Sequence, residues 1–122
     1  MTGIEVSVAT QFVDSESDFM NHRFFFAYTI TITNRGAGAA QLLNRHWVIT
    51  NGEGEVREVK GPGVVGEQPR ITPTRQYSYT SACVLETPVG SMQGAYEFQT
   101  DAGQRFLVPI PMFTLSVPNA VH

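Results

Sequence analysis

The clearest pattern in the chain is an alternation of large apolar residues with smaller or polar ones between positions 22 and 34. Phe24, Phe26, Tyr28, Ile30 and Ile32 fall on one side of an extended strand. The other side carries Phe25, Ala27, Thr29, Thr31 and Thr33. A period of two in aromatic and β-branched residues predicts a β-strand with one buried face. Burial of each large apolar side chain contributes about 1.5–3 kcal/mol, so this strand supplies a large part of the core.

Six other segments have the same β character and are separated by turn residues. They cover residues 4–13, 42–50, 55–60, 75–85, 95–100 and 104–110. In the segment 42–50 the alternation places Leu43, Trp47 and Ile49 on one face. No segment has the 3.6-residue period of a helix, so we expect strands and turns only.

Two short turns and two prolines shape the predicted sheets. Asn51–Gly54 and Asp101–Gly103 are typical of hairpin turns, because asparagine, aspartate and glycine accept positive φ angles. Pro109 and Pro111 cannot donate a backbone hydrogen bond, so the last strand is expected at a sheet edge or out of the ladder. Seven short strands predict an all-β, immunoglobulin-like β-sandwich of about seven antiparallel strands. The whole chain, 1–122, has the size of a single domain.

Composition and charge narrow the functional classes. The net charge is −3 with only 8 Lys and Arg, which argues against a nucleic-acid binder, because such proteins need a basic surface. The single cysteine, Cys83, rules out an intrachain disulfide and a cysteine-rich metal cage. Neither a signal-peptide pattern nor an apolar run long enough to span a membrane is recognisable. We therefore expect a soluble, cytoplasmic protein without membrane insertion.

A glycine-rich segment is the main candidate for binding chemistry. Gly61, Gly63 and Gly66 have the G-x-G-x-x-G spacing of dinucleotide-binding loops, but in those loops a helix follows and its N-terminus holds the pyrophosphate. Here another strand is expected to follow. A glycine-rich turn can still bind an anion through its N–H groups, with Lys60 and Arg70 on its flanks. The alternative is a structural or partner-contacting loop whose glycines permit positive φ angles.

Two adjacent valines in the same segment suggest a contact surface. Val64 and Val65 are apolar residues among glycines. They either pack beneath the sandwich or remain exposed for a partner protein, and their solvent exposure distinguishes these cases. Binding residues concentrate on loops that a rigid scaffold holds in place.

The other chemistry-bearing residues do not form a catalytic or metal-binding pattern. Asp14, Glu16 and Asp18 lack the glycine and the glutamate that complete an EF-hand loop, so they predict a solvated loop. His46 alternates with the inward-facing tryptophan and is expected on the outer sheet surface. Cys83 is expected to be a small buried thiol. We predict no catalytic residue, no cofactor and no metal ligand.

Successive blocks of the sequence resemble the ApaG family. They are FAYTI at 26–30, LLNRHWVI at 42–49, GPGVVGEQP at 61–69, YTS at 79–81, MQGAY at 92–96 and IPMF at 110–113, with Gly103 and Phe106 before the last block. The resemblance covers nearly the whole chain in order. Thr74 and Ala82 stand where the family usually has glycine, so the turn near residue 74 is expected to deviate.

The resemblance implies a fibronectin type III-like sandwich and a small bacterial protein. It also implies a loose association with cobalt resistance and magnesium efflux. Similar domains occur in certain eukaryotic F-box proteins and in a DNA-polymerase-delta-interacting protein, where a protein-contact role is suspected. The resemblance implies no established set of catalytic residues.

Two functional hypotheses remain open from the sequence. The first is a non-enzymatic module for protein–protein interaction, with an unidentified protein partner at the loop 61–70. The second is a small-ligand module that binds pyrophosphate or a nucleotide, with or without a divalent metal, at the glycine-rich loop. Pairing through a sheet edge would also allow a homodimer.

Overall fold

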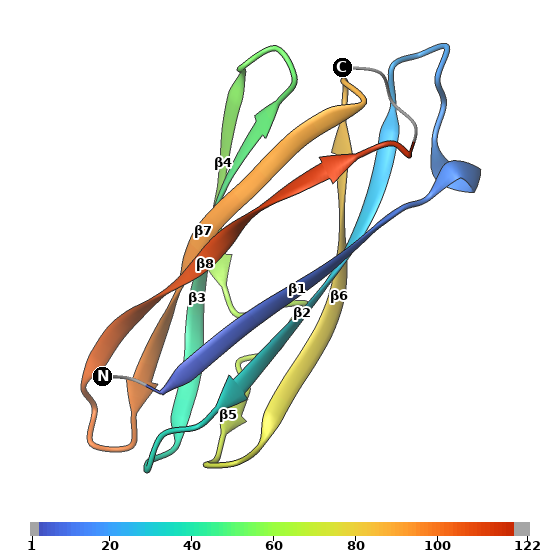
Figure 1. Cartoon of the computed structure of the whole chain (residues 1–122). Helices are drawn as coiled ribbons and strands as arrows, with labels where there is room; N and C mark the ends of the chain where they lie inside the picture. Colours follow the sequence, from blue (N-terminus) through green and yellow to red (C-terminus); the bar gives the residue numbers. More distant parts are fainter. Residues whose placement is uncertain (1–2, 119–122) are drawn as a thin grey trace.

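The structure is a computed structural model that describes residues 3–118, and it is built almost entirely from antiparallel strands (Figure 1). The strands are β1 (Ile4–Phe12), β2 (Phe24–Asn34), β3 (Ala40–Asn51), β4 (Val56–Pro62), β5 (Arg70–Ile71), β6 (Gln76–Leu85), β7 (Val89–Thr100) and β8 (Arg105–Ser116), and one 3-10 turn, η1, covers Asp14–Glu16. The predicted all-β class is confirmed. Within the described residues no helix is long and apolar enough to cross a membrane.

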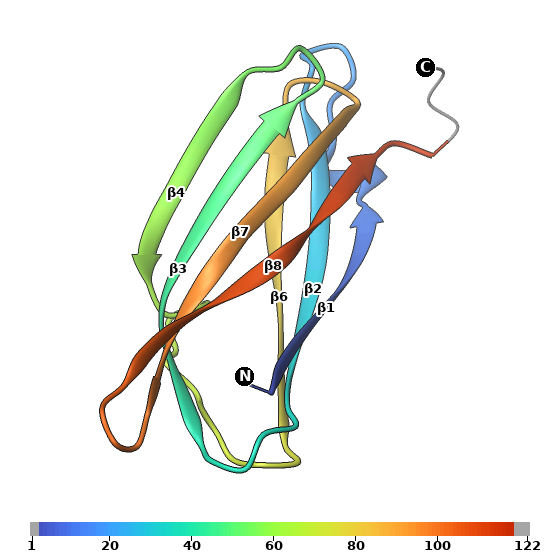
Figure 2. The same ribbon diagram turned by 60° about the vertical axis from the view of Figure 1, so that its left-hand side comes forward.

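The strands form two sheets that pack face to face (Figure 2). One sheet has the order β1-β2-β6, and the other has the order β4-β3-β7-β8 with β5 also on β3. β4 and β5 pair with different parts of β3 along the edge that β7 leaves open, so the second sheet is four strands wide. This arrangement confirms the predicted immunoglobulin-like and fibronectin type III-like sandwich.

The core lies between the sheets, and β2 supplies one wall of it as predicted. The five alternating residues of β2 are all buried, the most exposed of them, Tyr28, at only 6%. Trp47 of β3 is 3% exposed and packs edge-on against Tyr28, Tyr96 and Phe113, with ring centroids 5.6 to 6.4 Å apart. Edge-to-face aromatic contacts at this spacing are favourable, so Trp47 links the two sheets.

One predicted core position is wrong, because β3 contains a β-bulge. The register between β3 and β7 shifts between Leu42 and Asn44, which leaves Leu43 as the extra residue. Leu42 is fully buried and takes the core position, whereas Leu43 is only partly buried. A bulge moves the side chains before it to the opposite face, so simple alternation from Trp47 back to Leu43 fails.

The last strands run further than predicted. β7 begins at Val89, and β8 continues through Pro109 and Pro111 to Ser116. β8 is at the sheet edge as predicted, where a residue without an N–H is tolerated. A ladder irregularity between Met92 and Gly94 lies opposite Pro111. The two-residue strand β5 was not predicted at all.

Both predicted hairpin turns are present. Asn51 and Glu55 are joined by a backbone hydrogen bond of 3.0 Å, and Gly54 has a φ of 83°. The β7–β8 turn closes between Thr100 and Gln104, with a φ of 89° at its glycine. Each turn therefore has the left-handed residue that a three-residue hairpin loop requires.

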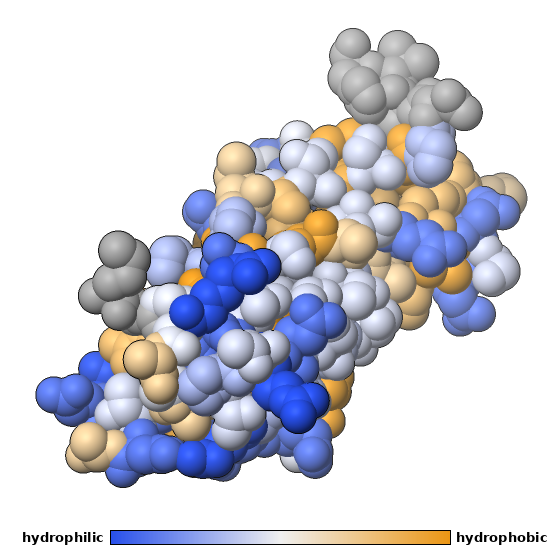
Figure 3. Space-filling model, turned by 60° about the horizontal axis from the view of Figure 1, so that its bottom comes forward, coloured by the Kyte–Doolittle hydropathy of each residue, from blue (hydrophilic) through white to orange (hydrophobic). Residues whose placement is uncertain are grey.

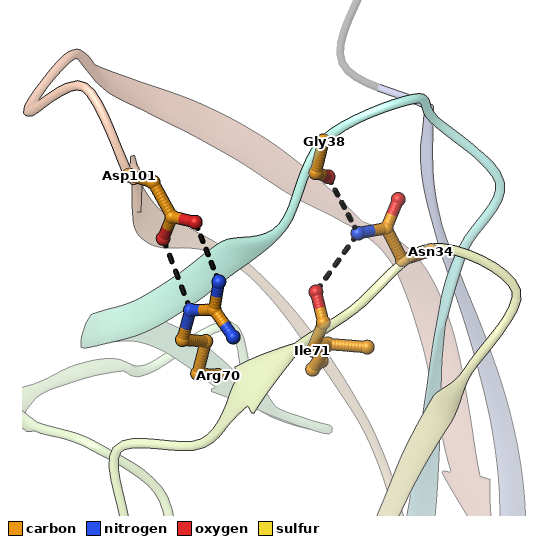
Figure 4. Close-up of polar contacts among 5 residues, drawn as sticks. All are labelled: Asn34, Gly38, Arg70, Ile71 and Asp101. Carbon is orange, nitrogen blue, oxygen red and sulfur yellow. Dashed lines mark hydrogen bonds and ion pairs between the residues drawn. The ribbon is translucent and has the colours of Figure 1, made fainter.

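Asn34, at the end of β2, is the one fully buried polar residue among those described (Figure 4). Its side-chain nitrogen donates to the carbonyl oxygens of Gly38 at 3.0 Å and Ile71 at 2.9 Å. Its side-chain oxygen accepts from the N–H of Gly36 at 2.9 Å. The side chain thus joins β2, the β2–β3 loop and β5 at one end of the sandwich.

The backbone of Asn34 holds the β5–β6 turn against the same end. The N–H of Asn34 donates to Arg75 at 2.9 Å, and its carbonyl accepts from Thr74 at 2.8 Å. Thr74 has a φ of 71°, a left-handed conformation that β-branched residues rarely adopt. The sequence difference at residue 74 therefore falls at a position that favours glycine.

Replacing Asn34 with alanine should destabilise the protein by about 3 kcal/mol, because buried carbonyl and N–H groups lose their partners. Equilibrium urea denaturation measures this change. The control is Asn44→Ala, because Asn44 is partly exposed and makes one side-chain hydrogen bond, to Glu97 at 2.7 Å; its cost should stay below about 1.5 kcal/mol. Equal losses for the two variants would contradict the central role of Asn34.

Candidate functional site

The glycine-rich segment folds as a tight hairpin between β4 and β5. Val64 and Glu67 exchange two backbone hydrogen bonds of 2.8 and 2.9 Å. The two residues between them, Val65 and Gly66, have φ angles of 42° and 82°. Positive φ at both central positions is the signature of a type I′ turn, so residues 63–67 form a two-residue β-hairpin. We call this the 63–67 hairpin.

The 63–67 hairpin is fixed to the bulge of β3. The carbonyl oxygen of Leu43 accepts from the N–H of Gly63 at 2.8 Å and from the side-chain amide of Gln68 at 2.9 Å. The guanidinium of Arg45 donates from Nη1 to the carbonyl oxygens of Pro62 at 2.9 Å and Gly63 at 3.0 Å. The extra residue in β3 therefore supplies an acceptor that anchors the hairpin.

The glycines of the segment meet local structural requirements. Gly63 has a φ of 62°, and a Cβ atom there would lie 2.2 Å from the carbonyl oxygen of Glu67. A Cβ atom on Gly61 would lie 3.1 to 3.3 Å from the guanidinium of Arg45. Gly66 occupies the second left-handed position of the turn. The G-x-G-x-x-G spacing is thus explained by the hairpin and by its contact with Arg45.

The two valines of the hairpin have opposite environments. Val64 is 1% exposed and belongs to the core, whereas Val65 is 55% exposed at the turn. Of the two predicted partner-contacting valines, the structure therefore leaves Val65 accessible and packs Val64 beneath the sandwich. Val65 is also strained, because a β-branched residue at positive φ is a conformational outlier.

Lys60 and Arg70 do not converge on the loop. Lys60 pairs with His46 in the ladder and lines a hollow of about 540 Å³ on the outer face, together with Leu107. Arg70 of β5 instead donates to both carboxylate oxygens of Asp101, at 3.0 and 2.5 Å, in the β7–β8 turn (Figure 4). The hydrogen bond from Arg70 lowers the pKa of Asp101 and raises that of the arginine.

The tyrosine hydroxyls of Tyr79 and Tyr96 and the thiol of Cys83 lie in the core. Tyr79 and Tyr96 share a hydrogen bond between their hydroxyl groups in the core, and burial raises the pKa of both. Cys83 is 5% exposed, as predicted, and burial raises the pKa of its thiol despite the nearby Arg57. A nucleophilic cysteine needs the opposite shift.

The predicted surface groups lie where the sequence analysis placed them. His46 is on the outer face, with Nε2 2.6 Å from the Glu58 carboxylate. Asp14 and Glu16 form the exposed 3-10 turn, and Asp18 bonds to the side chain of Asn21 at 2.6 Å. Between residues 3 and 118 no group of three or more His, Cys, Asp or Glu is arranged to hold a metal ion.

The sequence analysis missed two arginines that face the space between the sheets. Arg45 of β3 and Arg57 of β4 line the same inter-sheet hollow, of about 380 Å³, with Cys83 and Met92. The sequence does indicate the orientation of Arg45. It lies two residues from Trp47, so strand alternation places it on the inward face of β3. No motif spacing marks either arginine.

Exposed apolar side chains are spread over several loops and edges. They are Phe19, Met20, Val56, Val65, Leu107 and Met112. Figure 3 shows apolar groups over the middle and the upper right of one face, among hydrophilic ones, whereas the lower left is mostly hydrophilic. Phe19 packs edge-on against Phe12 and Phe24, so it also covers the core at that end. Val65 differs from all of these by combining exposure with a strained backbone.

Comparison with known proteins places this all-β sandwich in a family. The family model described as the ApaG domain matches residues 14–100. Protein ApaG of Acidithiobacillus ferrooxidans is 51% identical over 121 residues, covering 99% of this chain and 95% of that protein. Protein ApaG of Aromatoleum aromaticum is 52% identical over 119 residues, covering 98% and 94%. The chain belongs to the ApaG family.

A solved structure of a similar protein has the same fold as this chain. The crystal structure of a Bordetella pertussis protein named ApaA superposes with a TM-score of 0.94 at 44% identity, covering 98% of this chain and 97% of that one. The sandwich, the 63–67 hairpin and the inter-sheet arginines are therefore features of an ApaG-family chain.

The Arg70–Asp101 pair gives a pH-dependent signature. The carboxyl carbon of Asp101 should titrate below its usual pKa of 3.8, because the arginine stabilises the charged form. Because the pKa of Asp101 is lower in the folded than in the unfolded protein, the ion pair stabilises the fold at pH values above the unfolded-state pKa. This stabilisation is lost as the pH falls through the folded-state pKa. Carbon-13 NMR titration measures the midpoint. In Arg70→Gln the midpoint should return toward 3.8, and an unchanged midpoint would contradict the assignment.

Proposed function

We propose that this protein is a non-enzymatic binding module that acts in the cytoplasm and contacts a partner protein through the 63–67 hairpin. The observation that carries the proposal is Val65, which is 55% exposed at a φ of 42°. Strained residues persist where the surrounding structure fixes them, and they cluster at functional sites. Any link to cobalt resistance or magnesium efflux would then run through the partner.

The scaffold beneath the hairpin supports this proposal. Arg45, Gln68 and the bulge at Leu43 hold the hairpin by side-chain and backbone hydrogen bonds. A fixed hairpin loses little conformational freedom on binding, which favours affinity. The exposed valine is thus presented to a partner in one conformation.

The contacts favour this reading over a pyrophosphate or nucleotide site at the glycine-rich loop. Pro62 has no N–H, and the N–H groups of Gly63 and Val64 already donate within the protein. Arg70 is engaged by Asp101. An anion would therefore find few of the donors that a phosphate-binding loop offers.

Replacing Val65 with asparagine tests the proposal. Asparagine tolerates positive φ, so the variant should be more stable by up to about 1 kcal/mol in urea denaturation. Capture of partner proteins from lysate by the immobilised chain should nevertheless fall strongly, because the apolar contact is lost. Gain of stability with loss of capture is the expected pair of results.

The matched control is Val56→Asn on β4, where the valine is 62% exposed. It should retain the captured proteins and gain no stability. Capture of the same proteins by Val65→Asn at the wild-type level would contradict the proposal.

An amide NMR titration with pyrophosphate and magnesium nucleotides tests the alternative of a small-ligand site. Saturable chemical-shift changes confined to residues 60–70 would favour that alternative if they were absent in Lys60→Ala.

A further inference from the structure

The sandwich is closed along one side and open along the other. β1 lies against β8 on the closed side, whereas β4 and β6 stay apart over most of their length (Figures 1 and 2). The sheet that contains β4 is four strands wide, whereas the sheet that contains β6 has only three strands. Among residues 3–118, the three-stranded sheet therefore has no fourth strand next to β6 that would lie over β4. As a result Arg57 of β4 is exposed and Val59 is only partly buried.

The open side is hollowed beside residues 79–84 of β6. The hollow of about 380 Å³ has walls from both edges, with Arg57 and Val59 on one side and Ser81 and Cys83 on the other. A second hollow of about 200 Å³ leads on to Val65 and shares several lining residues with the first. The shared residues are Tyr28, Arg45, Trp47 and Ser81. The two hollows therefore form one groove, which we call the β4–β6 groove.

Two arginines give the β4–β6 groove an uncompensated positive charge. Arg45 donates to backbone carbonyls, and Arg57 donates from Nη2 to the carbonyl oxygen of Val84 at 3.4 Å. Within the described part of the chain neither has a carboxylate at ion-pair distance, whereas Arg35 and Arg70 each have one. Carbonyl groups satisfy N–H donors without neutralising the charge, so the groove is suited to a carboxylate.

The charge is strongest near Arg45. Glu55 and Glu86 line the next hollow beyond Arg57, so Arg57 has acidic groups in its wider surroundings. In the groove itself the lining groups near Arg45 are hydroxyl, aromatic and aliphatic side chains, including Tyr28 and Ser81. Arg45 is therefore the expected anchor for an acidic group.

The edge of β6 offers backbone hydrogen bonds to an incoming strand. The carbonyl of Val84 points away from β2, because it accepts from Arg57 on the other side. In an antiparallel strand the N–H and C=O of one residue point to the same side, and alternate residues share that side. Thr80 and Ala82 therefore direct their backbone groups into the groove. β6 has 10 residues, long enough for an extended segment to pair with it.

We propose that an extended, acidic segment of a partner protein adds as a strand to the open edge of β6, covers β4 and places a carboxylate on Arg45. Strand addition takes hydrogen bonds from the backbone and specificity from alternate side chains. Charge complementarity selects the acidic segment, and the uncovered inner face of β4 provides the space. This inference rests on the proposed function, because it names the chemistry of the partner that reaches Val65.

The probe is a short fluorescein-labelled peptide of alternating valine and aspartate, titrated against the full chain by fluorescence anisotropy. The matched peptide has lysine in place of aspartate. We expect saturable, salt-sensitive binding of the aspartate peptide and at least about tenfold weaker binding of the lysine peptide. Absence of binding, or equal binding of both peptides, would overturn the proposal.

Amide hydrogen exchange distinguishes strand addition from a simple charge contact. The amides of Thr80 and Ala82 should exchange quickly in the unbound chain and slowly with the aspartate peptide present. Peptide binding without this protection would overturn the strand addition. A concentration-dependent dimer that protects both amides without peptide would identify a second copy of the chain as the occupant and also overturn the proposal.

Variants locate the contact on the groove. Ala82→Pro removes an outward N–H and no bond to β2, so it should keep the fold and abolish peptide binding. Arg45→Gln should weaken binding about tenfold, but it also loosens the hairpin. Arg57→Gln avoids that problem and should weaken binding about two- to fivefold. Arg75→Gln, outside the groove, is the control, and an equal effect there would contradict the groove.

The experiments can contradict the hairpin contact and the strand addition at β6 independently of each other. Loss of partner capture in Val65→Asn without any peptide binding would sustain the hairpin contact and overturn strand addition. Peptide binding that protects Thr80 and Ala82, together with unchanged capture by Val65→Asn, would sustain strand addition and overturn the hairpin contact.

Discussion

The side chain of Asn34 is the interaction on which the arrangement of this molecule most depends. It is completely buried, and its amide serves the β2–β3 loop and β5 at once. A buried amide is favourable only when its donors and acceptors are satisfied, which requires these segments to come together in one geometry. β5 in turn sets where the chain leaves the 63–67 hairpin, so the position of the candidate site follows from a residue outside it.

The second constraint is the β-bulge of β3, which links core packing to the surface. The extra residue, Leu43, moves Leu42 into the core and turns a carbonyl toward the hairpin. Hydrogen bonds from the Gly63 N–H and the Gln68 amide to this carbonyl hold the hairpin against the sheet edge, together with those that Arg45 donates. This support explains how Val65 is kept in a left-handed conformation that its own side chain disfavours.

The sequence predicted those features whose cause is local. The alternation in β2 specifies one buried face because the pleat repeats every two residues, and the turns at Asn51 and Asp101 follow from their residue types. The bulge at Leu43 could not be predicted, because an inserted residue leaves composition and alternation on each side intact. The type I′ turn was hidden because valine is a poor residue for it. The groove was missed because it depends on which edges the two sheets leave uncovered, a property of the assembled fold.

The position of the chain ends has a consequence for how such a domain can be built into larger proteins. β1 and β8, the first and last strands of the described chain, are neighbours on the closed side, away from β4 and β6. A polypeptide fused before β1 or after β8 would therefore join the sandwich through a strand of the closed side. Attachment through these two strands leaves the edges of β4 and β6, which form the groove, without a covalent connection to the added segment.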